Sequence, residues 1–107
     1  DHTRLLNSTL ILLGDKARDR GRFFRMETGM GLNIRTEDKF TYGIVGQADI
    51  MGILRGGRHI WLECKTGNAV QSAQQKAFQK MIERWGGLYM VIREPREALG
   101  FVLENTV

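Results

Sequence analysis

Two carboxylates and a lysine stand in short segments of this chain that are otherwise apolar enough to form buried strands. Asp49 lies in residues 46–50, and Glu63 and Lys65 lie in residues 60–67. Burying a charge is unfavourable unless a counter-charge or a metal ion compensates for it. Glu63 and Lys65 are two positions apart, so on a strand both side chains project from the same face. Carboxylates from two neighbouring strands can hold a divalent cation beside the lysine, an arrangement that suits cleavage of a phosphodiester bond.

Whether the two carboxylates meet depends on the turn between their strands, which contains Arg55-Gly56-Gly57-Arg58. A two-residue loop would pair Asp49 with Cys64 and would point Asp49 away from Glu63. A three-residue loop would pair Asp49 with Glu63 and would give a glycine the left-handed conformation that such loops favour. The metal hypothesis therefore predicts a loop of odd length or a bulge.

The composition indicates one ordinary globular domain. With 107 residues, of which 42% are apolar and 26% charged, residues 1–107 form a single domain with no room for a second core. No apolar run reaches the roughly 20 residues that a membrane helix needs, and no secretion signal is recognisable, so a cytoplasmic protein is expected. Cys64 is the only cysteine, which excludes an internal disulfide and a zinc site built from several cysteines.

The net charge of +4 gives a weak indication of a nucleic-acid partner. Much of the excess lies in one run of basic residues, Lys16, Arg18, Arg20, Arg22 and Arg25. Both a solvated helix end and a surface that contacts phosphates would explain this run. The two histidines, His2 and His59, are far apart and show no ligand spacing, so neither is expected to be catalytic, and His59, beside a turn, is interpreted as a polar surface group.

Hydrophobic periodicity predicts the order of the elements. We expect a helix over about 3–20, either continuous or broken at Gly14, strands over 22–27, 47–54, 59–66 and 88–92, a helix ending at Gly86, and a short final helix over 96–104. Residues 29–46 fit either an irregular loop or a loose hairpin. The order is αβββαβ followed by a short helix, which predicts an α/β fold with a mixed central sheet flanked by helices.

The helix before Gly86 has the clearest pattern. Its apolar stripe is Phe78, Met81, Ile82 and Trp85. Ser72 and Gln75 have the spacing of a capping box, in which each satisfies a backbone N–H of the other. Trp61 and Trp85 are both expected in the core.

Several of these motifs together resemble the VRR-NUC domain, the virus-type replication-repair branch of the PD-(D/E)XK nuclease superfamily. They are Gly46-x-x-Asp49, Glu63-x-Lys65-Thr66-Gly67, Ser72-x-x-Gln75 and the Gly86-Gly87 helix exit, and the likeness extends to Phe24-Arg25 and Thr28-Gly29. The resemblance, to stand-alone phage-type members, implies a restriction-endonuclease-like core. It also implies a metal-dependent DNA endonuclease that acts as a homodimer on branched DNA such as four-way (Holliday) junctions, in a bacterium or encoded by its virus.

The resemblance also implies roles for individual residues. Asp49 and Glu63 would bind Mg²⁺ or Mn²⁺, with a backbone carbonyl near Cys64 completing the protein ligands. Lys65 would stabilise negative charge in the transition state or orient the attacking water, and we favour the first role. Gln75 would contact a phosphate or a water in addition to capping its helix. The competing interpretation is a simple salt bridge between Lys65 and the carboxylates.

One feature departs from the superfamily pattern. Many members carry a further glutamate on the first helix, whereas the corresponding stretch here, residues 6–9, has no carboxylate. Asn7 or Ser8 could replace it, or the site could hold a single metal ion. The departure also leaves open a non-catalytic DNA-binding module on a nuclease fold. Residues 29–46 are the candidate surface for dimerisation or for positioning DNA.

Overall fold

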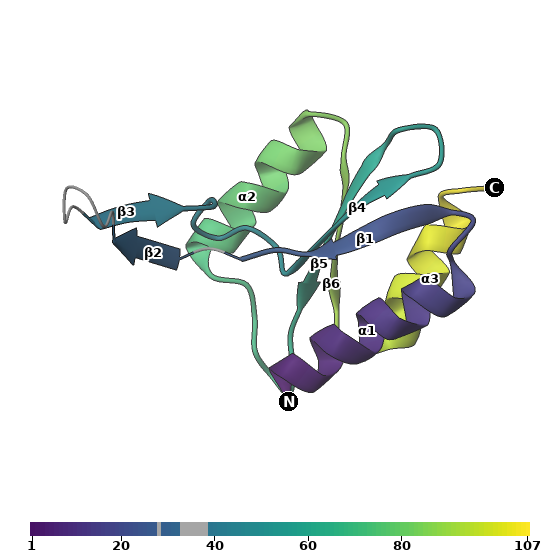
Figure 1. The fold of residues 1–107 in the computed structure, drawn as a ribbon, viewed down its shortest axis with the longest axis horizontal. Helices are drawn as coiled ribbons and strands as arrows, with labels where there is room; N and C mark the ends of the chain where they lie inside the picture. The colour runs from purple at the N-terminus through teal and green to yellow at the C-terminus, as the bar shows by residue number, and fades with distance from the viewer. Residues whose placement is uncertain (28, 33–38) are drawn as a thin grey trace.

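The computed structural model describes residues 1–27, 29–32 and 39–107. The elements in chain order are α1 (His2–Lys16), β1 (Gly21–Arg25), β2 (Gly29–Leu32), β3 (Lys39–Tyr42), β4 (Ile50–Leu54), β5 (His59–Cys64), α2 (Ala73–Arg84), β6 (Leu88–Ile92) and α3 (Pro95–Glu104). This α/β arrangement confirms the expected αβββαβ order and the short C-terminal helix, with β2 and β3 inserted after the first strand of the core (Figure 1). Within the described ranges, no helix is both long and apolar enough to cross a membrane.

The central sheet is mixed, with strand order β1-β4-β5-β6. β4 is antiparallel to β1 and β5, and β6 is parallel to β5 because α2 carries the chain back between them. Alternate residues of each strand face opposite sides of the sheet. One set packs against α1 and α3, as Ile50, Leu62 and Ile92 do. The other side packs against α2, where Phe78 and Tyr89 share a second core cluster.

α1 is continuous through Gly14 but ends at Lys16, so the expected boundary near residue 20 is wrong. Ala17, which is fully buried, leaves the helical conformation with a φ of −125°. The next turn folds back onto it, because the backbone N–H groups of Arg20 and Gly21 both donate to the carbonyl of Ala17. The end of this helix is therefore set by the packing of Ala17 rather than by a glycine.

The segment that the sequence left open, residues 29–46, contains a hairpin. β2 and β3 pair antiparallel from Gly29 opposite Tyr42 to Leu32 opposite Lys39. Figure 1 shows this hairpin standing out to one side of the four-stranded sheet. Residues 33–38 lie outside the described residues. This hairpin forms a sheet of its own and does not extend the central one.

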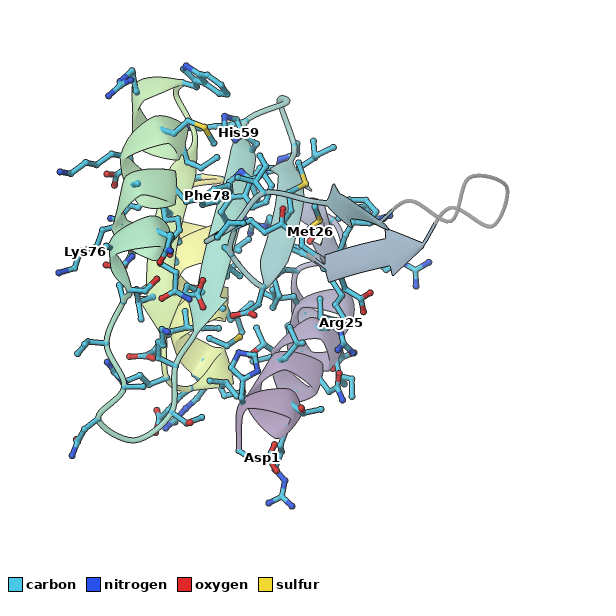
Figure 2. All side chains as sticks on the ribbon, turned by 90° about the vertical axis from the view of Figure 1, so that its left-hand side faces the viewer. Asp1, Arg25, Met26, His59, Lys76 and Phe78 are labelled. Carbon is cyan, nitrogen blue, oxygen red and sulfur yellow. The ribbon has the colours of Figure 1, made fainter. Side chains whose placement is uncertain are left out.

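α2 begins as its sequence predicts. The hydroxyl oxygen of Ser72 accepts from the N–H of Gln75, and the side-chain oxygen of Gln75 accepts from the N–H of Ser72, which completes the capping box. In Figure 2, Phe78 points from α2 towards the sheet while Lys76 points away from it. The helix stops before Gly86, whose φ of +84° few other residues adopt.

The two tryptophans have different environments. Trp61 is half-buried, and its ring meets the ring of Phe78 edge to face with centroids 5.0 Å apart, which confirms a packing role. Trp85 is 68% exposed, so the expectation that it lies in the core is wrong. It follows the last helical residue, and the chain turns away at Gly86 before its ring reaches the sheet.

Candidate metal centre

The turn between β4 and β5 fixes which residues face each other. The N–H of Leu54 donates to the carbonyl of Arg58 at 2.8 Å, which leaves residues 55–57 as a three-residue loop. Gly56 and Gly57 have φ angles of +97° and +99°. The expected loop of odd length is therefore confirmed. The register pairs Ile50 with Leu62; Asp49 directly precedes β4 and Glu63 directly follows Leu62, and a side-chain oxygen of each lies within 4.8 Å of the other.

Asp49 is held by its neighbours on both sides. Its backbone carbonyl accepts from the N–H of Met26, just beyond β1, at 2.8 Å. Its side-chain Oδ2 accepts from the backbone N–H of Cys64 at 2.8 Å. Gly46 positions the preceding loop: with φ at +86°, it lies so close to α2 that a Cβ there would stand 2.5 Å from the carbonyl oxygen of Gln74. The loop that carries Asp49 thus rests on the first turn of α2.

Glu63 is a buried carboxylate with one unsatisfied oxygen. The residue is 3% exposed, and its Oε2 accepts from Nε2 of Gln75 at 3.3 Å. Its Oε1 is buried and has no hydrogen-bond partner. Burial, together with the neighbouring carboxyl of Asp49, raises the pKa of Glu63 to about 8, although the charge of Lys65 acts in the opposite direction. An unpaired buried oxygen of this kind is costly unless a cation or a proton occupies the site.

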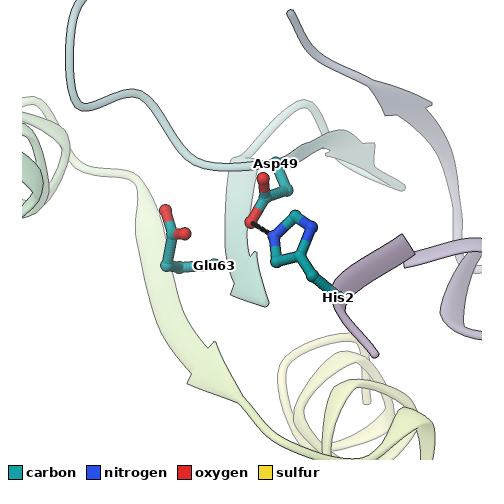
Figure 3. A group of neighbouring side chains, drawn as sticks. All are labelled: His2, Asp49 and Glu63. Atoms are coloured by element: carbon teal, nitrogen blue, oxygen red, sulfur yellow. Dashed lines mark ion pairs between the residues drawn. The ribbon is translucent and has the colours of Figure 1, made fainter. Parts of the chain in front are cut away.

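His2 joins the two carboxylates from the first turn of α1. Its Nε2 lies 3.3 Å from Oδ2 of Asp49, and one ligand atom from each of His2, Asp49 and Glu63 lies within 4.8 Å of the other two. Figure 3 shows the imidazole and the Asp49 carboxylate facing each other beside Glu63. The spacing of the two histidines in the sequence did not predict this contact, in which the side chain of His2 remains 49% exposed.

A signal for His2 was present in the sequence. The buried stripe of α1 includes Leu6, Thr9 and Leu13, and counting back four residues from Leu6 reaches His2. By contrast Asn7 and Ser8 are exposed, and among the described residues neither is hydrogen-bonded to either carboxylate. The expectation that one of them replaces the missing carboxylate finds no support in these contacts.

Lys65 and Cys64 follow Glu63 with different roles. Lys65 is half-buried, and in the part of the chain that the structure describes no ion pair joins it to Asp49 or Glu63. The simple salt-bridge interpretation is therefore wrong. The Cys64 side chain is fully buried in the core cluster against α1 and α3, as expected. Burial raises the pKa of its thiol to about 12, so this thiol is not a nucleophile.

His59 is more than a surface group. It is half-buried, and its Nδ1 accepts from the indole N–H of Trp61 at 2.9 Å. Its other ring nitrogen lies 3.4 Å from the carbonyl of Trp85. These contacts link His59, the first residue of β5, to the end of α2, and we assign it a structural role.

Part of the basic run serves the fold. Arg20 donates to the backbone carbonyl of Thr106 at 3.0 Å, and Arg55 donates to the same carbonyl. Arg22 donates to the carbonyl of Arg18. The guanidinium of Arg20 ties the turn after α1 to the end of α3, so this residue is not simply part of a solvated helix end.

No protein-family model matches the chain, and no curated protein matches it either. The arrangement brings together two carboxylates, an imidazole, an amide and a nearby ammonium group. Oxygen ligands of this kind suit a hard divalent cation.

Proposed function

We propose that this chain is a metal-dependent DNA endonuclease that hydrolyses phosphodiester bonds in branched DNA, as its resemblance to VRR-NUC domains implies. The observation that carries the proposal is the buried Oε1 of Glu63, which has no partner although it lies beside a second carboxylate. Neighbouring buried carboxyl groups are stabilised either by a proton or by a bound cation, and the proposal is that a cation takes the place of the proton.

The donor set fits Mg²⁺ or Mn²⁺. Asp49 and Glu63 would each supply a carboxylate oxygen, and Cys64 would supply its backbone carbonyl. The N–H of Cys64 already faces Asp49. Since a strand residue presents its N–H and C=O to the same neighbour, we expect this carbonyl to face the same side. When bound there, the ion would polarise the scissile phosphate and lower the pKa of a bound water.

The remaining side chains would act on the substrate and on the ligands. Lys65 lies close enough to Glu63 to oppose the rise in the pKa of Glu63. Because no ion pair within the described residues occupies it, its ammonium group can stabilise the charge that develops on the phosphate. Gln75 would hold Glu63 in place through Nε2 and contribute polar contacts at the edge of the site.

A homodimer would match a branched substrate. Resolution of a four-way junction requires two symmetric cuts, and each chain contributes one candidate site, so a twofold dimer is the natural arrangement. The hairpin of β2 and β3 is the candidate contact surface, because an isolated two-stranded hairpin is marginally stable without a partner. The net charge of +4 is compatible with contacts to phosphates.

The test is cleavage of a synthetic four-way junction in the presence of Mg²⁺ or Mn²⁺. We expect the wild type to introduce paired nicks, and Asp49→Ala and Lys65→Ala to lose this activity. Lys80→Ala removes an exposed lysine from α2 and is the matched control for charge. If Asp49→Ala or Lys65→Ala cut the junction as well as the wild type, the catalytic proposal is wrong.

One observation favours a non-catalytic DNA-binding module instead. Oδ2 of Asp49 already has two protein partners, the N–H of Cys64 and the ring of His2. A module of this kind would bind DNA with a steep dependence on salt and would be indifferent to metal. Calorimetric titration with Mn²⁺ separates the two functions. The endonuclease should bind Mn²⁺ and lose this binding in Asp49→Ala, whereas the module should show no Mn²⁺ binding that depends on Asp49.

A further inference from the structure

Of the three side chains in the candidate metal centre, His2 alone offers a nitrogen atom, whereas Asp49 and Glu63 offer oxygen atoms. His2 comes from α1, which packs mainly on the opposite face of the sheet from Glu63, and its ring reaches Asp49 from the end of the helix. Asp1 caps this helix by accepting from the N–H of Arg4 at 2.9 Å, and Leu5 and Leu6 anchor the first turn in the core. The position of the imidazole is thus set by a well-anchored helix end.

A hydrogen bond between His2 and Asp49 does not account for the whole arrangement. The distance of 3.3 Å from Nε2 to Oδ2 is longer than the roughly 2.7–2.9 Å of a strong charge-assisted hydrogen bond. Such a bond would also leave Oε1 of Glu63 without a partner. A single cation among the three residues would satisfy the imidazole and both carboxylates together.

The spacing is compatible with three ligands of one ion. Metal–nitrogen and metal–oxygen bonds of about 2.0–2.2 Å place neighbouring ligand atoms about 3 Å apart. The His2–Asp49 distance is close to this value. The Glu63 oxygen lies within 4.8 Å of both other ligand atoms, so a modest movement of one carboxylate would complete the set.

We propose that His2 is a direct ligand in this centre and makes it prefer transition-metal ions such as Co²⁺ and Mn²⁺ over Mg²⁺. The proposal rests on the proposed function only in that the site must bind a divalent ion. Mg²⁺ favours oxygen ligands, whereas imidazole binds more tightly to ions later in the first transition series. The imidazole therefore adds affinity for Co²⁺ that it does not add for Mg²⁺.

The test is calorimetric titration with MgCl₂, MnCl₂ and CoCl₂ at one fixed pH, together with the visible spectrum of bound Co²⁺. We expect affinity to increase from Mg²⁺ through Mn²⁺ to Co²⁺. In His2→Ala, the affinity for Co²⁺ should fall roughly tenfold or more, while the affinity for Mg²⁺ changes far less. The Co²⁺ spectrum should change because a nitrogen ligand is lost.

Two further variants sharpen the result. His2→Glu replaces nitrogen by oxygen, and we expect it to bind Mg²⁺ more tightly than His2→Ala while the preference for Co²⁺ stays low. Thr3→Ala alters an exposed neighbour on the same helical turn and should bind all three ions like the wild type. Unfolding measured in EDTA checks that every variant is folded.

The outcomes separate this inference from the proposed function. If ions bind in a manner that Asp49→Ala abolishes but His2→Ala leaves the Co²⁺ affinity unchanged, His2 is not a ligand and the inference fails alone. An equal loss for Mg²⁺ and Co²⁺ in His2→Ala also contradicts it. If the wild type binds none of the three ions, the proposed metal-dependent function fails as well.

Discussion

Nε2 of Gln75 lies 3.3 Å from Oε2 of Glu63, so the residue that caps α2 also contacts the buried carboxylate of β5. The two ends of this amide have separate partners, because its oxygen accepts from the N–H of Ser72 at 2.9 Å. The start of α2 and the orientation of Glu63 are therefore fixed by one side chain. A substitution that changes only one end of the amide can separate these roles.

Gln75→Glu should preserve the helix start and impair the metal centre. A glutamate at this position still accepts from the N–H of Ser72, but it places a second oxygen where Nε2 faced Glu63. We expect a Tm in EDTA close to that of the wild type and a clear loss of junction cleavage.

Ser72→Ala provides the reverse comparison. It removes the hydroxyl that accepts from Gln75 and should lower the free energy of unfolding by about 1 kcal/mol. Metal affinity should remain. Chemical denaturation and calorimetry measure the two effects, and a similar loss of metal binding in Ser72→Ala would contradict the separation of roles.

Glu63→Gln should abolish metal binding without unfolding the protein. The neutral amide keeps the shape of the side chain and can still accept from Gln75, but it cannot lose a proton to become the carboxylate that a metal ion requires. We expect affinity for Mn²⁺ to fall by roughly a factor of 100 and the metal-free Tm to stay level or rise. Glu104→Gln, an exposed change on α3, is the control for charge. Unchanged Mn²⁺ affinity in Glu63→Gln would exclude this carboxylate as a ligand.

The stability of the metal-free protein should fall as the pH rises. Burial and Asp49 raise the pKa of Glu63 from 4.5 to about 8, so between these values the folded state binds a proton that the unfolded state has lost. This contribution is complete below pH 4.5 and is lost as the pH passes through about 8. The charged or titratable groups around Glu63 include His2, Asp49, Cys64, Lys65 and Tyr89.

Unfolding curves in EDTA across this range measure the effect. The wild type should lose more stability with rising pH than Glu63→Gln, which has no proton to lose at this position. Mn²⁺ should protect the wild type more at the high end of the range, because it competes with the proton for the carboxylate. Parallel pH profiles for the two proteins would show that Glu63 titrates normally.

Gly46→Ala should destabilise the fold and weaken the metal centre together. A methyl group there would meet the carbonyl of Gln74, and the φ of +86° is unfavourable for alanine. We expect the free energy of unfolding to fall by about 1–3 kcal/mol and Asp49 to be displaced.

Gly14→Ala should have the opposite effect on stability. This helical glycine has open space around it, so alanine should raise the free energy of unfolding by about 0.5–1 kcal/mol. Denaturation curves that show the same change for both variants would contradict this account.

The sequence predicted the elements and the contact between the two carboxylates because both depend on short-range patterns. Periodicity located the strands and α2, and the two glycines located the turn, but its odd length was predicted only from the hypothesis that both carboxylates bind one metal ion. The end of α1 was missed because it depends on the burial of Ala17 against the sheet. His2 was missed because its contact with Asp49 joins residues that are remote in sequence. Trp85 has the spacing of the apolar stripe of α2, which predicted a buried side chain, but the helix ends at Arg84, one residue before it.

The loop over residues 55–57 constrains how this protein can vary. The five residue-to-residue steps from Asp49 to Leu54 span about 17 Å, so the turn lies far from the two carboxylates. Adding or removing two residues there, one on each strand, would keep Asp49 and Glu63 on the same face of the sheet. A shift of one residue in the pairing of β4 with β5 would turn one of these carboxylates to the opposite face of the sheet. A contact between two carboxylates is thus controlled by a surface turn that touches neither of them.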